Sequence, residues 1–133
     1  MFARLELQTR HRTEMVDITA EVQAQVARSG VKSGLCLVWV PHTTAGLTVN
    51  ENADPSVRRD ILAGLDRLVP REGDYHHSEG NSDGHIKSTL CGRDVTLIVE
   101  GGALVLGTWQ GIFFCEFDGP RRRNVLVKVV ADG

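Results

Sequence analysis

The stretch DVTLIVEGGALVLGTW, residues 94–109, decides the fold class because it predicts a β-hairpin. Two apolar runs, 94–100 and 103–109, flank the pair Gly101 and Gly102. Two glycines between such runs are a strong signal for a two-residue hairpin turn, since both turn positions favour a positive φ. The last third of the chain is therefore predicted to be built from antiparallel strands.

The β pattern also occurs outside this hairpin. Short apolar or alternating runs predict further strands over residues 2–7, 34–40, 47–49, 111–117 and 125–131. The run 34–40 is apolar at successive positions, which is typical of a strand covered on both faces.

Two helices are expected between these strands. Residues 17–29 repeat an apolar side chain every four positions, and Gly30 can end that helix. The second helix begins with Asp54 as its N-cap and Pro55 in its first position, and Pro70 ends it. Its apolar face consists of Val57, Ile61, Leu65 and Leu68.

Residues 70–88 follow neither the helical nor the strand pattern of apolar residues and are predicted to be irregular. The segment is polar and rich in glycine and histidine, and an ordered loop of this length in a compact domain usually has a function. Because nothing in the sequence indicates a linker or a repeat, we expect one α+β domain over residues 1–133. We expect a mixed or antiparallel β-sandwich with two helices packed on it.

Composition excludes several classes of function. The 15 basic and 17 acidic side chains leave a net charge of −2, which does not favour a nucleic-acid-binding protein. The run Arg121-Arg122-Arg123 is interpreted as a solvated charge cluster. No stretch approaches the roughly 20 apolar residues that a membrane span needs, and residues 1–12 lack the apolar centre of a signal peptide. We expect a cytoplasmic protein with reduced cysteines.

Histidines are the first candidates for chemistry. His42 follows the strand 34–40, and His76, His77 and His85 lie in the irregular segment. Neutral imidazole is the commonest metal ligand and a frequent acid or base near pH 7. Their spacing matches no standard zinc motif, so solvated loop histidines remain the alternative. His11, among charged residues, is expected at the surface.

A second candidate cluster is the run Asn50-Glu51-Asn52-Ala53-Asp54 before the second helix. These residues can simply form a turn and a helix cap. They can also bind a ligand, because a helix N-terminus attracts phosphate and a carboxylate such as Glu51 suits a metal-bound water or Mg²⁺.

Two further groups are candidates for contacts with substrate. Lys87 and Ser88 place a cation and a hydroxyl near His85, which suits a phosphate. Trp109 and Gln110 lie between two glycines, where a ligand can approach closely, although core packing is the alternative for the tryptophan.

Taken together, these segments resemble the YjbQ family, small proteins often described as secondary thiamine-phosphate synthases. The matching stretches are HTTAGLTVNEN at 42–52, DPSVR at 54–58, YHH at 75–77, GHIKS at 84–88 and GTWQGI at 107–112. They occur in the family's order and cover nearly the whole chain.

The resemblance implies an α+β fold and a homotrimer with its sites near subunit boundaries. It also implies that His42, His77 and His85 lie together, whereas His76 occupies a variable position. The loop from Glu79 to Gly84, which contains Asp83, is shorter than in some relatives. The activity it implies is thiamine-phosphate synthesis, in which a pyrimidine pyrophosphate joins a thiazole phosphate and pyrophosphate leaves.

The leading hypothesis is therefore a metal-dependent enzyme acting on phosphorylated small molecules. In it, His42, His77 and His85 hold a divalent metal, zinc in the first place and Mg²⁺ as the alternative. Glu51 and Lys87 are the candidate catalytic residues. The candidate substrate contacts are Asn50, Asn52, Ser88, Trp109 and Gln110.

Two other functions stay open at this stage. The same residues suit a metal-dependent hydrolase of a phosphate ester or amide. The third possibility is a trimeric binding or scaffold protein, in which the histidines hold a structural metal or a small anion. An open coordination position facing a cleft would favour an enzyme, and a closed four-ligand site would favour the scaffold.

Overall fold

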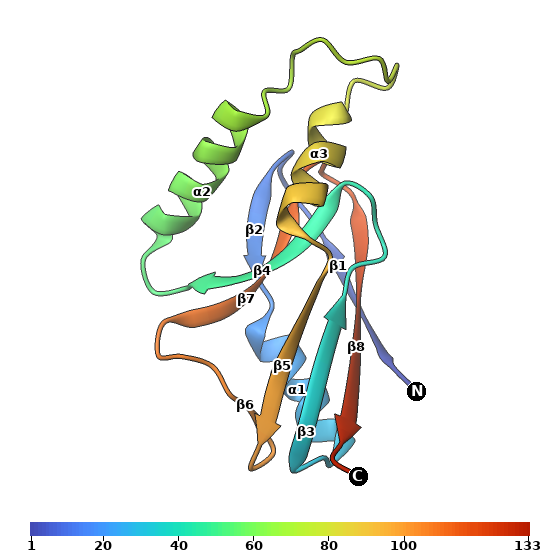
Figure 1. Ribbon diagram of the computed structural model, residues 1–133, viewed down its shortest axis with the longest axis vertical. Helices are drawn as coiled ribbons and strands as arrows, with labels where there is room; N and C mark the ends of the chain where they lie inside the picture. Colours follow the sequence, from blue (N-terminus) through green and yellow to red (C-terminus); the bar gives the residue numbers. More distant parts are fainter.

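A computed structural model describes all residues 1–133, arranged as strands and helices in the order shown in Figure 1. The strands are β1 (Ala3–Gln8), β2 (Glu14–Asp17), β3 (Ser33–Trp39), β4 (Ala45–Glu51), β5 (Asp94–Glu100), β6 (Ala103–Leu104), β7 (Gln110–Glu116) and β8 (Arg122–Ala131). The helices are α1 (Thr19–Ser29), α2 (Pro55–Leu68) and α3 (Ser82–Cys91).

The strands form two antiparallel sheets. A five-stranded sheet has the order β1-β8-β3-β5-β6, and a three-stranded sheet has the order β2-β7-β4. The α+β class and the antiparallel sheets are as the sequence predicted. A third helix, α3, is an addition to the two that were expected.

The main core lies between the two sheets and is closed at one end by α1. Val22 and Val26 of α1 pack with Cys36 and Val38 of the five-stranded sheet and with Leu47 of the three-stranded sheet. All of these side chains are buried. Their removal from water is the main force that holds the two sheets together.

A second, smaller apolar cluster lies on the other face of the three-stranded sheet. Met15, Phe113, Cys115 and Phe117 are its buried members, and Ile61, Leu62 and Leu65 of α2 pack against them together with Cys91 of α3. The three-stranded sheet is therefore covered on both faces, by the main core on one side and by α2 and α3 on the other (Figure 1).

The hairpin and the second helix form where the sequence predicts them. Glu100 pairs with Ala103, and the turn between them has positive φ at both Gly101 (61°) and Gly102 (77°). Asp54 caps α2 by accepting a hydrogen bond from the Ser56 amide at 2.9 Å. The second hairpin strand is shorter than predicted, because β6 comprises only Ala103–Leu104.

The interpretation of residues 70–88 as irregular throughout is wrong, since α3 begins at Ser82. Helical periodicity could not reveal α3 because the residues it buries are Asp83, Gly84, Lys87 and Ser88. A search for an apolar stripe finds none there. The short strand β2 was also missed.

The expectation that strand 34–40 is covered on both faces is wrong for the single chain. Gly34, Cys36 and Val38 are buried, but the alternating side chains Leu35, Leu37 and Trp39 are exposed. The five-stranded sheet thus has one face on the core and one open apolar face. No helix of the structure has both the length and the apolar character that crossing a membrane requires.

Candidate functional site

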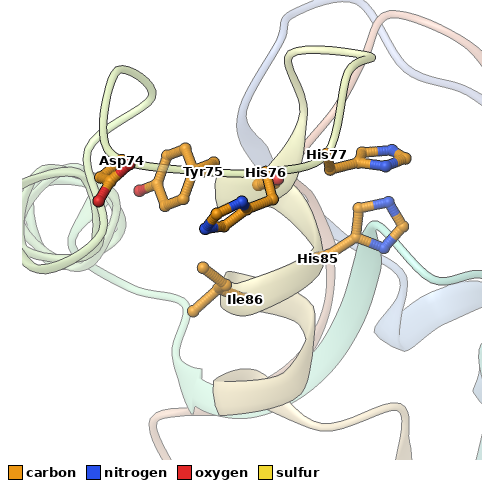
Figure 2. A pocket seen from close by; sticks show the side chains of 7 residues that line it. Asp74, Tyr75, His76, His77, His85 and Ile86 are labelled. Atoms are coloured by element: carbon orange, nitrogen blue, oxygen red, sulfur yellow. The ribbon is translucent and has the colours of Figure 1, made fainter.

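A pocket of about 370 Å³ lies between the loop that follows α2 and the first turns of α3 (Figure 2). Its lining comprises Asp74, Tyr75, His76, His77, Ser82, His85 and Ile86. The loop is tied back to the end of α2 because the Tyr75 hydroxyl donates a 2.5 Å hydrogen bond to the Pro70 carbonyl. Loop and helix together gather three of the five histidines of the chain in one pocket.

His77 and His85 face one another within this pocket. Their ring centroids are 5.4 Å apart and the rings are nearly perpendicular, at 85°. The Nε2 atom of His77 is also 3.9 Å from a carboxylate oxygen of Glu79. His76 points to the other side of the loop, towards Ile86 (Figure 2). Two imidazoles therefore face one another in the pocket, and a carboxylate lies close to one of them.

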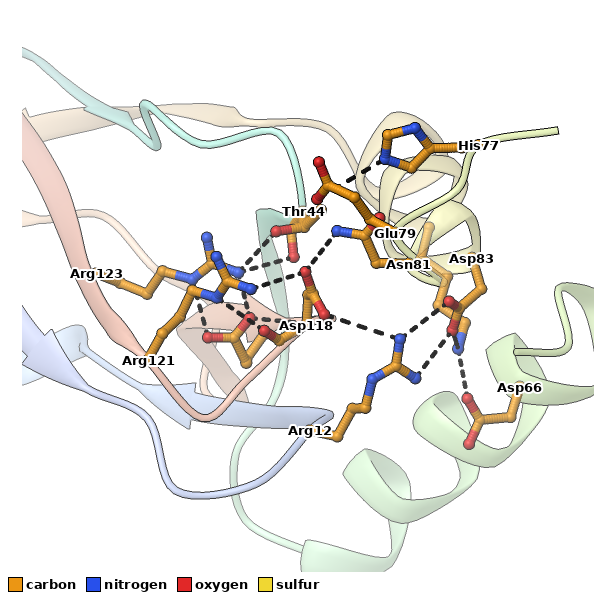
Figure 3. Close-up of polar contacts among 12 residues, drawn as sticks. Arg12, Thr44, Asp66, His77, Glu79, Asn81, Asp83, Asp118, Arg121 and Arg123 are labelled. Carbon is orange, nitrogen blue, oxygen red and sulfur yellow. Dashed lines mark hydrogen bonds and ion pairs between the residues drawn. The ribbon is translucent and has the colours of Figure 1, made fainter. Parts of the chain in front are cut away.

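Helix α3, which carries His85, is held by buried ion pairs (Figure 3). Asp83 accepts a hydrogen bond from Arg12 at 3.1 Å and lies 3.4 Å from Lys87 Nζ. Lys87 in turn lies 2.5 Å from Asp66 of α2. Burial favours a raised pKa for Asp83, but hydrogen bonds and charge from Arg12 and Lys87 outweigh it and hold the pKa below its ordinary value. The carboxylate is thus charged at neutral pH.

Lys87 and Ser88, which the sequence analysis assigns to the substrate, instead contact other parts of the protein that hold α3 in place. Only 2% of the Lys87 side chain is exposed, and both carboxylates near it are protein partners. The Ser88 hydroxyl donates a 2.6 Å hydrogen bond to the Ala45 carbonyl. Their surroundings favour the positioning of α3 over contact with a substrate.

Gly84 lets α3 approach the end of β7. A Cβ atom at this position would lie 2.9 Å from the Phe117 carbonyl oxygen, which is closer than ordinary packing allows. The Asn81 amide adds a 2.8 Å hydrogen bond to the Asp118 carboxylate. The first turn of α3 is therefore fixed to the same chain segment that follows β7.

A second buried ion pair supports the segment between β3 and β4. Arg123 donates hydrogen bonds to Glu116 at 2.5 Å and to the Thr44 hydroxyl at 2.9 Å, and Thr9 donates to Glu116 at 2.7 Å. Burial favours a raised pKa for Glu116, but hydrogen bonds from Arg123 and Thr9 outweigh it and the pKa is lowered.

The interpretation of Arg121–Arg123 as a solvated charge cluster is therefore wrong for Arg123, which is buried. The signal that identifies it is the two-residue period of β8, because Arg123 shares a face with the buried Val125 and Val127.

His42 lies beside this second ion pair and is not part of the His77–His85 pair. Its Nε2 accepts a 2.9 Å hydrogen bond from the Asn124 amide, so the ring proton is on Nδ1. Burial and the charge of Arg123 lower the pKa of His42, which keeps the ring neutral. No three His, Cys, Asp or Glu side chains of the chain meet as a metal-ligand group.

The remaining predicted site residues form a separate cluster at the far end of β4. Glu51 pairs with Gln110, and the Asn52 amide donates a 2.9 Å hydrogen bond to the Trp109 carbonyl. The Gln110 side chain accepts a hydrogen bond from the Gly107 amide, and Asn50 accepts one from the Glu51 amide. Trp109 is 62% exposed, so core packing does not account for it.

The structure thus divides the predicted site between two places. Ala45, the first residue of β4, contacts α3 through Ser88, whereas Glu51 is the last residue of the same strand. Six residue steps of a β-strand separate them by about 20 Å. The histidines His77 and His85 are gathered at one end, and Glu51, Asn52, Trp109 and Gln110 at the other.

The chain matches known proteins along nearly its whole length. A family model described as UPF0047 protein YjbQ-like matches residues 3–132. A UPF0047 protein of Methanocaldococcus jannaschii is 52% identical over 99% of this chain and 96% of its own length. The protein YugU of Bacillus subtilis is 50% identical, over 98% of this chain and 99% of its own length.

Solved structures agree with these matches. The crystal structure of a YjbQ/UPF0047 family protein from Clostridium acetobutylicum superposes with a TM-score of 0.95 at 53% identity, covering 96% of this chain and 99% of that one. A YbjQ-like protein from Sulfolobus solfataricus has a TM-score of 0.95 at 34% identity, over 99% and 97% of the two chains. The names of these relatives state no specific activity.

Proposed function

The chain belongs to the YjbQ-like UPF0047 family, and on that premise we propose that it is a metal-dependent enzyme acting on phosphorylated small molecules. The reaction that we propose first is thiamine-phosphate synthesis. In that reaction a pyrimidine pyrophosphate is joined to the ring nitrogen of a thiazole phosphate, and the bond to pyrophosphate breaks.

The observation that carries this proposal is the pair His77 and His85 at the mouth of the loop–helix pocket. The two rings are 5.4 Å apart at their centroids, and both border a volume of about 370 Å³. Catalytic metal sites combine a few imidazole or carboxylate ligands with a position open to substrate. A pocket bordered by two such rings offers that combination.

The donor chemistry suits a divalent metal. His77 and His85 would supply two ligands and His42 the third, with zinc preferred because imidazole nitrogens suit it and Mg²⁺ the alternative. The lowered pKa of His42 favours ligation, since a ligating imidazole must be neutral. Because the three rings do not meet as a ligand group in this structure, His42 would have to give up the hydrogen bond that its Nε2 accepts from Asn124 and move towards the pair. When bound, such a metal polarises a phosphate oxygen as a Lewis acid.

The first turn of α3 suits the phosphate itself. Ser82 lines the pocket at the start of this helix, where backbone N–H groups without helical partners attract anions. In this proposal Lys87 holds the helix through Asp66 and Asp83, and Ser88 holds it through Ala45. Both act as positioning residues.

We further propose that the chain works as a homotrimer. The open face of the five-stranded sheet carries the exposed apolar side chains Leu35, Leu37, Trp39, Ile98 and Val130. A contiguous apolar surface of this kind is typical of a subunit interface. In this arrangement the Glu51 cluster of one subunit would lie near the histidine pocket of another, with Glu51 as acid or base.

Light scattering during size-exclusion chromatography tests the homotrimer. We expect three chains per particle for the wild type and a single chain for Leu37→Asp. Leu68→Asp is the control, because Leu68 is also an exposed leucine, at 76% against 38% for Leu37, but lies on α2. A monomeric wild type would refute this part of the proposal.

Metal analysis of protein purified without a histidine tag tests the site. After zinc supplementation we expect close to one zinc ion per chain, with a large loss in His77→Ala and His85→Ala. His76→Ala is the control, since His76 lines the same pocket but points elsewhere. Fewer than about 0.1 zinc ions per wild-type chain would reject the metal site.

Product analysis distinguishes the reactions. Pyrophosphate release that requires both thiamine precursors together supports synthesis, and its loss in Glu51→Gln supports the role of Glu51. Turnover of a single phosphate ester without a second substrate would support the hydrolase instead. A metal that stabilises the fold while no turnover occurs would support the scaffold protein.

A further inference from the structure

A second cavity, of about 260 Å³, lies between α2, α3 and the outer face of the three-stranded sheet. Three of its lining residues carry sulfur, namely Met15, Cys91 and Cys115. Apart from Thr48 and Asn50, the rest of the lining is leucine, isoleucine and phenylalanine. The cavity is therefore poor in oxygen and nitrogen donors and rich in soft sulfur donors.

Strand register and the packing of α3 place the three sulfur-bearing residues in a row. Cys115 on the central strand β7 is directly opposite Met15 on β2 and directly opposite Gly46 on β4. Residues directly opposite one another in an antiparallel pair point to the same face of a sheet. A Cβ atom on Gly46 would lie 3.1 Å from Cys91 Sγ. Cys91 of α3 therefore occupies the space that a side chain on Gly46 would fill.

The two thiols in this row interact. A hydrogen bond with the Cys115 thiol lowers the pKa of Cys91, and the same contact together with burial raises the pKa of Cys115. Cys91 is half-buried, and its thiol also donates to the Leu47 carbonyl at 3.3 Å. Cys91 is thus the more accessible of the two thiols, since Cys115 is buried.

We propose that Met15, Cys91 and Cys115 form a binding site for one copper(I) ion. Thiolate and thioether sulfurs select Cu(I) over harder ions, and three sulfur donors satisfy its low coordination number. On binding, the two S–H bonds break, two copper–thiolate bonds form and two protons pass to solvent, while the Met15 thioether donates a lone pair. The ion keeps its oxidation state throughout.

This site is separate from the histidine pocket. His85 lies in the first half of α3 and Cys91 is its last residue, so six residue steps separate them by about 9 Å along the helix axis. The two positions also face different sides of the helix, since six steps of a 3.6-residue turn leave them about 120° apart. Copper binding at this site therefore does not depend on the proposed zinc chemistry.

Competition for Cu(I) with bathocuproine disulfonate, a chelator whose Cu(I) complex is coloured, tests the site. The reduced chain is used under anaerobic conditions. We expect each wild-type chain to withdraw one copper ion from the chelator. Cys91→Ser and Cys115→Ser should each weaken binding by about tenfold or more, which corresponds to at least about 1.4 kcal/mol. Met15→Leu keeps the volume and should weaken binding by a smaller factor. Native mass spectrometry should show one copper ion per chain, adding the mass of copper less one proton at a given charge state, as expected for Cu(I).

Two controls keep the experiment specific. Cys36→Ala removes the third thiol, which is buried in the main core away from the cavity, and should leave binding unchanged. His77→Ala with His85→Ala should also leave it unchanged. Wild-type affinity in the Cys91→Ser/Cys115→Ser double variant, or in Met15→Leu, would overturn the three-sulfur site.

Discussion

Helix α2 is attached to the protein through apolar side chains, whereas α3 is attached through charged ones. Ile61, Leu62 and Leu65 of α2 lie on the small apolar cluster, yet no residue of this helix is fully buried. α3 buries Asp83 and Lys87 and makes ion pairs with Arg12 and Asp66. An amphipathic period therefore reveals a helix that lies on a surface, but not one that is held in place by buried polar groups.

The largest effect should follow from Asp83→Ala, which breaks the centre of the α3 ion pairs. Removing one partner leaves Arg12 and the buried Lys87 without their shared carboxylate. Loss of a partner from a buried ion pair costs about 3–5 kcal/mol in the free energy of unfolding. Urea unfolding measures the loss.

A double variant separates the ion pair from simple packing. In Asp83→Leu/Lys87→Met both charges of the pair are replaced by apolar groups of similar size. This variant should recover much of the stability lost in Asp83→Ala, because the buried Lys87 charge is removed together with its partner, while Arg12 keeps the Asp118 carboxylate at 3.8 Å. Equal losses in the two variants would argue against the ion pair as the cause.

Acid should weaken α3 in the same way but less strongly, because protonation removes the charge of Asp83 and leaves its volume. The pKa values of Asp83 and Glu116 are lowered in the folded protein. A lowered folded pKa stabilises the protein above the unfolded values of about 3.9 and 4.3, and that stability is lost as pH falls through the folded pKa. We expect the free energy of unfolding, measured from pH 7 to pH 3, to fall below about pH 5.

Asp83→Asn tests the assignment of this acid sensitivity. The variant cannot lose a charge at this position, so its stability should be lower at pH 7 and should fall less steeply in acid. An unchanged slope below pH 5 would assign the acid sensitivity to other carboxylates.

A pair of glycine substitutions compares how closely the two helices approach the sheet. Alanine is favoured over glycine in a helix by about 1 kcal/mol, and a Cβ at Gly64 of α2 would meet nothing closer than 3.9 Å. Gly64→Ala should therefore stabilise the protein by about that amount. At Gly84 of α3 the Cβ would lie 2.9 Å from the Phe117 carbonyl oxygen, and we expect Gly84→Ala to destabilise by about 1–2 kcal/mol.

Melting temperatures of the two variants give the comparison directly, since the substitution is the same in both. Shifts of the same sign and size would show that α3 moves freely to accommodate the methyl group. They would contradict the close contact between Gly84 and β7.

The smallest effects should come from single contacts on the two helices. Ser88→Ala removes the 2.6 Å hydrogen bond to the Ala45 carbonyl and should cost about 1–2 kcal/mol, because a buried acceptor loses its donor. Leu68→Ala changes a side chain of α2 that is 76% exposed and should cost less than about 0.5 kcal/mol. Chemical denaturation measures both, and a larger loss in Leu68→Ala would show that α2 packs more deeply than the contacts indicate.

The sequence predicts the fold where local residue types suffice. Gly101 and Gly102 predict their turn because few residues tolerate positive φ, and Asp54 with Pro55 predicts the start of α2. α3 could not be predicted in this way. The partners that stabilise it, Arg12 and Asp66, lie 71 and 21 residues from the side chains they contact, and local patterns carry no information about such distant pairs.

The candidate site was predictable only in part, for the same reason. His77 and His85 were candidates from their residue type, and the family resemblance indicated that they lie together. Spacing could not show that the His42 Nε2 accepts a hydrogen bond from the Asn124 amide, 82 residues away. Nor could it show that β4 separates Glu51 from the histidines, because that requires the strand's position relative to α3.

The two edges of the five-stranded sheet restrict how copies of the chain can associate. At one edge, β1 directs Arg4, Glu6 and Gln8 to solvent, and at the other edge β6 contributes only two residues. Charged side chains and very short strands at an edge oppose the addition of a further strand. Backbone pairing into extended fibrils is therefore disfavoured at both edges. The exposed apolar surface lies on the face of the sheet, where side-chain packing can form a closed assembly of limited size.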